Sequence, residues 1–172
     1  MSRFVDPDPS HRVLLAGTYN AHPVTMAAAI ATIERLLMDD GQVYRHVEML
    51  GDRMQKGLET ILSKLSLRAG VARQGSAFCL YFMDHCPIDW HDLAGHHAFS
   101  LDEKMRRDLI EHGIYFFPLA TKQCSISAAH TEHDIDVTLH QVESALTKCL
   151  GENPGEAFVA VSRTTSQGGM GG

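Results

Sequence analysis

The chain has 172 residues, of which 44% are hydrophobic and 21% charged, a balance typical of one folded domain. Its formal net charge is -6, and no run of lysines or arginines forms the basic stripe that nucleic acid requires. No apolar stretch reaches the roughly 20 residues that cross a bilayer, and the first residues lack the apolar core of a signal peptide. We therefore expect no nucleic-acid partner, no membrane insertion and a cytosolic location.

The N-terminal part of the chain divides into a segment without periodicity and a helix. Residues 1–22 contain prolines and a glycine and predict an extended entry segment. Pro23 suits the first position of a helix, which we expect over 24–38 and which Asp39-Asp40-Gly41 ends. This helix is apolar around nearly its whole circumference, so it requires burial on every side.

A second helix and a strand pair follow. Over 43–65, apolar residues recur every three or four positions between charged ones, which predicts a long surface helix packed by one face. Two short runs, 67–73 and 77–83, are split by Gln74-Gly75-Ser76 and predict paired strands. The segment 84–100 is rich in Pro, Asp and His and predicts a loop with at most a helical turn.

The C-terminal half alternates helices with short strands. We expect a helix over 101–110 that Gly113 stops, a strand over 114–117 and a short strand over 125–128. Thr131 begins a capping box in which Asp134 reaches back. The apolar stripe of the last helix is Ile135, Leu139, Val142, Leu146 and Cys149 or Leu150.

These elements predict an α+β fold in which a small antiparallel sheet is covered by helices. We divide the chain into the extended segment 1–22, a small domain over 23–150 and a flexible tail over 151–172. The tail is rich in Gly, Ser and Thr and cannot bury enough apolar surface to order itself.

The cysteines and histidines do not form a recognisable metal motif. The four cysteines, at 79, 86, 124 and 149, contain no Cys-x-x-Cys pair, so we expect reduced and mostly buried thiols. No His-Glu-x-x-His pattern occurs, and we interpret the clustered histidines as loop and cap residues, with no metal site. These histidines are His91, His96, His97, His130 and His133.

The remaining polar residues give little indication of catalysis. Asp89, Asp92 and Asp102 are interpreted as solvated loop and cap residues. Ser76 follows a glycine, but no Gly-x-Ser-x-Gly elbow is present, so a hydrolase is not indicated. We therefore assign no catalytic residue.

The most specific local feature is the loop Ala16-Gly17-Thr18-Tyr19-Asn20-Ala21-His22-Pro23, which leads into the first helix. Gly17 permits close backbone approach, and Thr18 offers a hydroxyl and an N–H, so the loop could hold a phosphate. Taken alone, the same residues also fit an ordinary capped loop.

This loop and the alanine-rich helix after it resemble the Gly-Thr-x-x-x-Asn/His-Pro motif of class III aminotransferases, which use pyridoxal 5'-phosphate. The stretch 74–82 resembles the strand region of that family's small domain, and 113–118 and 127–136 resemble its C-terminal signature. The likeness covers about residues 10 to 150, and glutamate-1-semialdehyde aminomutase-like proteins are the nearest relatives that it suggests.

The resemblance implies a role for the loop. In that family the threonine of the motif, here Thr18, hydrogen-bonds the cofactor phosphate of the neighbouring subunit. Gly17 would keep the approach open, and Tyr19 and Asn20 would lie near the cofactor. These four residues are our candidate cofactor-binding residues, and none of them transfers protons.

The chain also departs from the family pattern. Transamination needs a lysine that binds the cofactor covalently and moves a proton, and in the family this lysine precedes the Gly-Thr motif. Here no lysine occurs before Lys56. The resemblance thus implies a C-terminal segment that is inactive alone and acts as a homo-oligomer or with a separate large-domain chain on a small-molecule amino donor. The alternative is a non-catalytic α+β interaction module that dimerises through helix 24–38.

Overall fold

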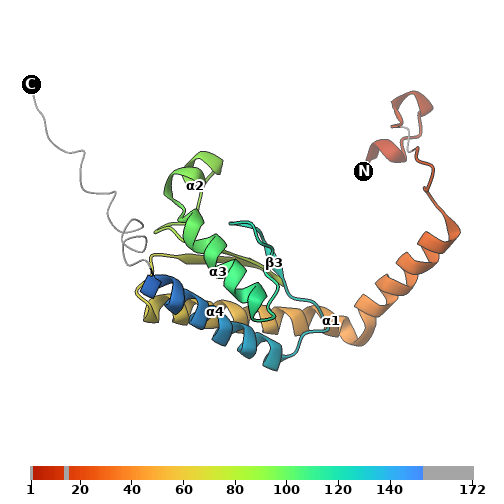
Figure 1. The fold of residues 1–172 in the computed structure, drawn as a ribbon. Coiled ribbons are helices and arrows are strands. Elements are labelled where there is room, and N and C mark those ends of the chain that lie inside the picture. The colour runs from red at the N-terminus through yellow and green to blue at the C-terminus, as the bar shows by residue number, and fades with distance from the viewer. Residues whose placement is uncertain (1, 14–15, 153–172) are drawn as a thin grey trace, which may run out of the picture. The chain divides into compact units, whose positions relative to one another are not determined.

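The computed structural model describes residues 2–13 and 16–152, and the chain forms two compact units, Met1–Gln42 and Val43–Gly172 (Figure 1). The sequence-based domain boundary after residue 22 falls inside the first unit. Over the described residues, no helix combines the length and the apolar character that a membrane span needs. Each unit is described by itself below.

The first unit begins with two short 3₁₀ turns, η1 (Ser2–Phe4) and η2 (Pro9–His11). Asp8 caps η2, because its carboxylate accepts a hydrogen bond from the backbone N–H of Ser10 at 2.8 Å. The segment predicted as extended therefore contains local turns. The reason is local chemistry, since an aspartate followed by a proline favours the start of a helical turn.

Helix α1 (Pro23–Lys64) has a break in its backbone. Pro23 is its first residue, as predicted. Met38 leaves the helical region, and Asp39, Asp40 and Gly41 adopt left-handed dihedral angles with φ of 51°, 55° and 71°. Aspartate and glycine tolerate this region best, so the break falls where the sequence offers them. The predicted end of the first helix is confirmed, and α1 consists of two helical parts, 23–37 and 42–64.

The first part of α1 exposes its apolar side chains. Apart from the half-buried Leu36, every residue from Pro23 to Leu37 is exposed in the chain by itself. The large exposed side chains are Val24, Met26, Ile30, Ile33 and Leu37. The burial on every side that the sequence requires is thus not supplied within the described part of this unit.

The second unit contains a three-stranded antiparallel sheet in the order β1-β2-β3. Strand β1 (Gly70–Gln74) pairs with β2 (Ala77–Tyr81), with Gln74 opposite Ala77. Gly75, at φ +58°, occupies the two-residue turn between them, where a left-handed residue is required. The predicted strand pair is confirmed, with slightly shorter strands.

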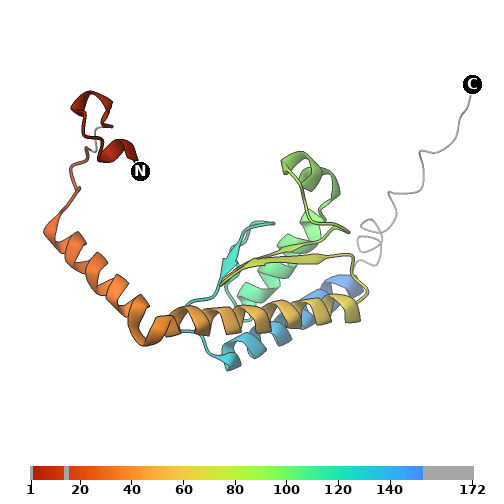
Figure 2. The same cartoon turned by 180° about the vertical axis from the view of Figure 1, so that it is seen from behind.

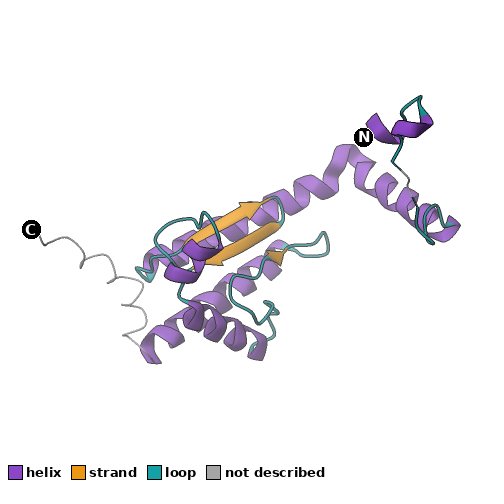
Figure 3. Cartoon of the chain, turned by 90° about the horizontal axis from the view of Figure 1, so that it is seen from above, coloured by secondary structure: helices purple, strands orange, loops and turns teal. Residues whose placement is uncertain are grey.

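The helices of this unit pack under the hairpin. Gly57 in the second part of α1 lies directly against Leu139 of α4 (Glu132–Glu152), and α4 also packs on α3 (Phe99–Glu111). Figures 2 and 3 show the β1–β2 hairpin lying along the second part of α1. The core joins apolar residues of all these elements: Leu50, Met54, Leu58, Phe78, Leu80, Phe82, Met105, Leu109, Ile135, Val142 and Leu146.

Two predicted segments differ from the observed structure. The segment 84–100 holds a seven-residue helix, α2 (Trp90–His96), which Asp89 caps by accepting from the N–H of Asp92. The predicted strand over 114–117 is wrong. Its Phe116 N–H bonds the Ile114 carbonyl at 3.2 Å, two residues back, and so is not available to a neighbouring strand.

The end of α3 explains why the chain turns at this point. Gly113, at φ +81°, follows the cap residue His112 and donates to the carbonyl of Ile110, while Ile114 donates to that of Leu109. This pair of bonds is a Schellman motif. The predicted stop at Gly113 is confirmed, and the motif directs 114–117 into a loop.

The last strand and last helix largely follow the sequence. Strand β3 (Cys124–Ser125) is shorter than the predicted 125–128 and is extended by one bond from the Ile126 N–H to the Ser76 carbonyl. The capping box is confirmed, because the Thr131 N–H donates to Asp134 Oδ2 at 2.7 Å and the Asp134 N–H to Thr131 Oγ1 at 3.3 Å. Helix α4 continues to Glu152, and the rest of the expected tail, 153–172, lies outside the described residues.

Candidate functional site

The loop 16–23 consists of two successive turns that lead into α1. The Asn20 N–H donates to the Gly17 carbonyl at 3.0 Å, and the His22 N–H donates to the Tyr19 carbonyl at 3.2 Å. Ala21 takes a positive φ of 57° between them. The His22 carbonyl then accepts the first helical bond, from Met26, so the loop ends on the N-terminus of a helix.

Gly17 is the point of close approach within this loop. A Cβ atom built at Gly17 would lie 3.0 Å from Asn20 Oδ1, so the Asn20 side chain folds back over the glycine. Thr18 and Tyr19 are exposed, and the Tyr19 ring lies 6.3 Å from that of His22. Of the four predicted site residues, the structure brings Gly17 and Asn20 together and leaves Thr18 and Tyr19 facing solvent.

The charge around the loop suits an anion. Neither the loop 16–23 nor the first turn of α1 contains an acidic residue. The N-terminus of a helix carries a partial positive charge and free N–H groups, which favour phosphate. Thr18 adds an exposed hydroxyl. The donor set of the loop therefore fits the phosphate group of a cofactor.

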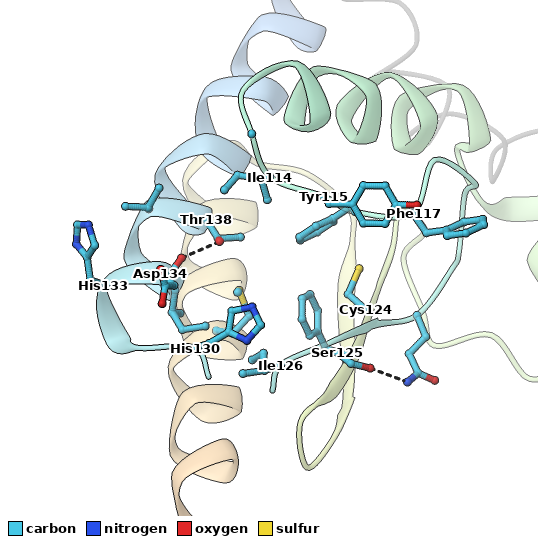
Figure 4. Close-up of a pocket in the computed structure, with 17 residues that line it drawn as sticks. Ile114, Tyr115, Phe117, Cys124, Ser125, Ile126, His130, His133, Asp134 and Thr138 are labelled. Carbon is cyan, nitrogen blue, oxygen red and sulfur yellow. Dashed lines mark hydrogen bonds between the residues drawn. The ribbon is translucent and has the colours of Figure 1, made fainter. Parts of the chain in front are cut away.

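A separate pocket of about 670 Å³ lies in the second unit (Figure 4). It opens between the loop after α3, strand β3 and the first turns of α4. The side chains that Figure 4 labels around it are Ile114, Tyr115, Phe117, Cys124, Ser125, Ile126, His130, His133, Asp134 and Thr138. Aromatic and apolar groups thus face a polar wall at the start of a helix.

The polar wall of the pocket is fixed by short hydrogen bonds. The His130 Nδ1 accepts from the backbone N–H of Ser127 at 3.0 Å. The ring nitrogen Nε2 of His46 lies 2.9 Å from the His130 carbonyl, and Thr138 Oγ1 donates to the Asp134 carbonyl at 2.7 Å. His130 is a turn residue that precedes α4, in agreement with its interpretation from sequence.

Two aromatic side chains project from the other wall. Tyr115 is 71% exposed and Phe117 is 41% exposed, with their ring centroids 6.5 Å apart. The loop that carries them is held from the core, because Arg106 Nη1 donates to the Phe117 carbonyl at 3.0 Å. The wall is therefore an apolar surface on a fixed backbone.

A buried polar cluster supports this loop and was not foreseen. Asp102 accepts from Arg106 Nε at 2.6 Å, from the Thr121 N–H at 2.7 Å and from His97 Nε2 at 3.1 Å. The second ring nitrogen of His97 accepts from the Phe82 N–H at 3.1 Å. The interpretation of Asp102 as a solvated residue is wrong, because its side chain is fully buried. His97 is the C-cap residue of α2, as a cap interpretation predicts, but its side chain is buried as well.

One sequence pattern points to part of this cluster. Asp102 and Arg106 are four residues apart on one helix, a spacing that pairs opposite charges. An exposed ion pair and a buried one share that spacing, so the sequence pattern alone does not distinguish them. The histidine and the Thr121 N–H come from other segments, which only the fold brings together.

The cysteines offer no activated nucleophile among the described residues. Cys79 and Cys149 are buried, Cys124 is half-buried and Cys86 is exposed, so the prediction of mostly buried thiols is confirmed. Burial raises the pKa of Cys124 to about 11 and also raises the pKa of Cys79. A raised pKa keeps a thiol protonated at neutral pH, and the thiolate is the reactive form.

Comparison with known proteins identifies relatives by sequence. No protein-family model matches the chain. It is 35% identical over 140 residues to the glutamate-1-semialdehyde 2,1-aminomutase of Akkermansia muciniphila, covering 81% of this chain and 32% of that protein. The same enzyme of Thermus thermophilus is 33% identical over 138 residues, which cover 80% of this chain and 32% of the relative.

Comparison with solved structures identifies proteins of the same kind by fold. A transaminase with bound pyridoxal phosphate superposes with a TM-score of 0.67 and 25% identity, over 87% of this chain and 33% of the other. A glutamate-1-semialdehyde aminomutase from Pseudomonas aeruginosa has a TM-score of 0.70 at 20% identity, over 83% of this chain and 32% of the other. The chain thus spans about a third of the length of these proteins.

The fold and these likenesses define the class: the chain has the fold of about one third of a fold type I transaminase. Within the class, it is similar to the glutamate-1-semialdehyde 2,1-aminomutases over about a third of their length. A span of one third is consistent with a C-terminal segment, as the motifs predicted. The predicted α+β class with a small antiparallel sheet is confirmed.

Two lysines of this segment form ion pairs on the helix surface. Lys56 is exposed on α1 and pairs with Asp52 at 2.6 Å, one turn earlier. Lys64, at the end of the same helix, pairs with Glu143 of α4. These two lysines are thus surface groups in ion pairs.

Proposed function

We propose that this chain is the small-domain part of an aminomutase or aminotransferase that uses pyridoxal phosphate, and that its loop 17–20 contacts the cofactor phosphate. The observation that carries the proposal is the similarity to glutamate-1-semialdehyde 2,1-aminomutases over a third of their length, combined with the absence of any lysine before Lys56. The lysine-bearing portion is then supplied by residues outside this segment.

When bound, pyridoxal phosphate supplies the electron sink for amino-group transfer. The part assigned to this chain is anchorage. Thr18 donates its hydroxyl hydrogen and its N–H to the phosphate, as charge-assisted bonds that fix position without moving a proton. Gly17 and Asn20 hold the turn that presents these donors, and Tyr19 lies beside the cofactor.

The exposed apolar face of 23–37 supports a role in a larger assembly. Val24 and Leu37 are 71% and 68% exposed in the chain by itself, and single chains rarely leave such a surface uncovered. We assign this face to contact with a second copy or with the large domain. The small-molecule amino donor binds in the assembled enzyme, for which we expect a cytoplasmic location.

The proposal is tested by reconstitution. The full chain is mixed with the lysine-bearing two thirds of the Akkermansia relative, and retention of pyridoxal phosphate after gel filtration is measured. Thr18→Ala is expected to lose one or two charge-assisted bonds of about 1.5 to 3 kcal/mol each, which weakens retention by at least tenfold. Thr25→Ala, an exposed threonine on α1, is the matched control and retains the cofactor. Equal retention by both variants removes Thr18 from the site.

A second candidate function rests on the same exposed helix. The chain could act as a non-catalytic module that dimerises through 24–38, because that face is apolar and exposed. Sedimentation of the chain, alone and mixed with the large-domain chain, separates the two functions. A stable dimer that never binds a large-domain chain favours the module, whereas association with the large domain and cofactor retention favour the enzyme segment.

A further inference from the structure

Three polar side chains of the second unit converge at helix α2, and none of them lines the pocket. Asp92 and His96 are four residues apart on α2, and His85 comes from the loop before it. One potential ligand atom from each residue lies within 4.8 Å of the other two. The imidazole rings of His85 and His96 meet edge to face, with their centroids 5.3 Å apart.

We propose that His85, Asp92 and His96 form a binding site for a divalent transition-metal ion, with Zn²⁺ as the ion of choice. Two imidazoles and one carboxylate are ligands that Zn²⁺ accepts. With three protein ligands, a fourth position stays open to water. The site does not depend on the cofactor or on the function proposed above.

The distances already approach those of a bound ion. His85 Nε2 lies 3.0 Å from each Asp92 oxygen, and His96 Nδ1 lies 2.9 Å from Asp92 Oδ1. Ligand atoms 2.0 to 2.1 Å from a tetrahedral ion lie about 3.3 Å apart. These two separations need to widen by only a few tenths of an ångström, which rotation of the exposed imidazole rings can supply, and the two histidine ligand atoms lie within 4.8 Å of each other.

The carboxylate at the centre of the cluster is held in place by the backbone. Asp92 accepts the N–H of Ile88 at 3.1 Å, and its own N–H is bound by the cap residue Asp89 at 2.9 Å. Its side chain is only 13% exposed, although both histidine partners are accessible. The carboxylate is therefore fixed before any ion binds, and the open side of the cluster faces solvent.

A fourth residue orients His85 as a ligand. Asp84 Oδ1 lies 2.7 Å from His85 Nδ1. When Nδ1 carries the proton and donates it to Asp84, Nε2 presents its lone pair toward Asp92. Histidines that bind metals commonly donate their other N–H to a carboxylate in this way, which fixes the tautomer and raises the basicity of the ligand.

The local charge also favours a cation. When both imidazoles are neutral, the carboxylates of Asp84, Asp89 and Asp92 carry three negative charges. The guanidinium of Arg68, whose Nη1 lies 4.0 Å from Asp84, neutralises one of them. The competing account is that His85 is protonated and forms an ion pair with both Asp84 and Asp92. That ion-pair account requires no metal ion and explains the same contacts of His85 with Asp84 and Asp92.

The two accounts differ in whether the full chain binds Zn²⁺. Calorimetric titration with zinc chloride near neutral pH is expected to give one ion per chain. His85→Ala and His96→Ala are each expected to weaken binding by more than a hundredfold. Asp84→Asn is expected to cost ten- to a hundredfold, the loss typical of a residue that only orients a ligand.

Matched controls separate this site from incidental binding. His91→Ala removes an exposed histidine of α2 that lies outside the cluster. Cys86→Ser removes the exposed thiol that follows His85 in the sequence. Both variants are expected to bind Zn²⁺ as the unaltered chain does. Urea unfolding without metal checks that His96→Ala is folded. No binding by the unaltered chain, or equal binding by folded His96→Ala, overturns the proposal.

Discussion

The carboxylate of Asp102 lies 2.6 Å from Arg106 Nε inside the second unit, and neither side chain has any exposed surface. His97 and the Thr121 N–H complete the hydrogen bonds of this carboxylate. The buried carboxylate of Asp102 therefore links helix α3 to the loop before β3 and, through the His97 ring, to the Phe82 N–H that follows β2.

Removal of that charge should be costly. Asp102→Ala leaves the Arg106 guanidinium buried without its partner, so the free energy of unfolding is expected to fall by about 3 to 5 kcal/mol. The exposed pair Glu103–Arg107, on the same helix at 4.0 Å, is the control. Glu103→Ala should cost less than about 1 kcal/mol. Urea unfolding measures both, and equal losses would contradict the account.

The capping box of α4 gives a second test. Thr131→Ala removes the acceptor of the Asp134 N–H, so we expect a loss of about 1 kcal/mol in the free energy of unfolding. Thr147→Ala is the control, because this exposed threonine lies inside the helix, where alanine is the better helix former. The melting temperature of Thr131→Ala should be lower than that of Thr147→Ala. The reverse order would show that the Thr131 cap does not stabilise α4.

The close contact between α1 and α4 gives a third test. A Cβ atom at Gly57 would lie 2.3 Å from Leu139 Cδ1, so Gly57→Ala is expected to destabilise the fold by about 1 to 3 kcal/mol. Combining it with Leu139→Ala removes the clash, so the double variant should lose less than the sum of the two single variants. Additive losses in urea unfolding would show that the helices do not meet at this point.

At Gly51 the same substitution cannot be relieved in this way. A Cβ there would meet the backbone oxygen of Gly75 at 2.5 Å, and truncation of a side chain does not remove a backbone atom. Gly51→Ala therefore serves as the contrasting variant in the same measurement.

The pH dependence of stability is expected to involve Asp136. Arg53 donates two hydrogen bonds to this carboxylate, at 2.7 and 2.8 Å, and these bonds lower the pKa of Asp136. A carboxyl whose pKa is lower in the folded state contributes stability above its unfolded pKa of about 3.9, and this stability is lost as the pH falls through the folded pKa. The melting temperature should fall less steeply below pH 4 in Asp136→Asn and in Arg53→Ala. Unchanged profiles in both variants would contradict this role.

Local chemistry explains what the sequence could predict. Asp39-Asp40-Gly41, Gly113 and the Thr131–Asp134 box act through neighbouring backbone groups, so the residues alone predicted the helix ends. The strand predicted over 114–117 failed because an apolar run does not reveal whether a partner strand exists. There the Schellman bonds of α3 and the turn at Phe116 take the backbone groups instead.

Sites built from separate segments were harder to predict. Asp89 is a solvent-side cap as expected, whereas Asp102 is buried, and both occur in similar polar sequence. The sequence does not single out His85 as a metal ligand, because the spacing 85, 92 and 96 matches no short metal-binding pattern. The Gly17–Asn20 loop, in contrast, was found through its likeness to a family motif.

The most direct test of the central claim is amino-group transfer by the chain with and without the lysine-bearing domain. The purified chain, given pyridoxal phosphate and an amino donor, is expected to show no turnover, and activity should arise only when the lysine-bearing two thirds of the Akkermansia relative are added. Turnover by the isolated chain at the rate of the mixture would contradict the claim that this segment depends on another for its catalytic lysine.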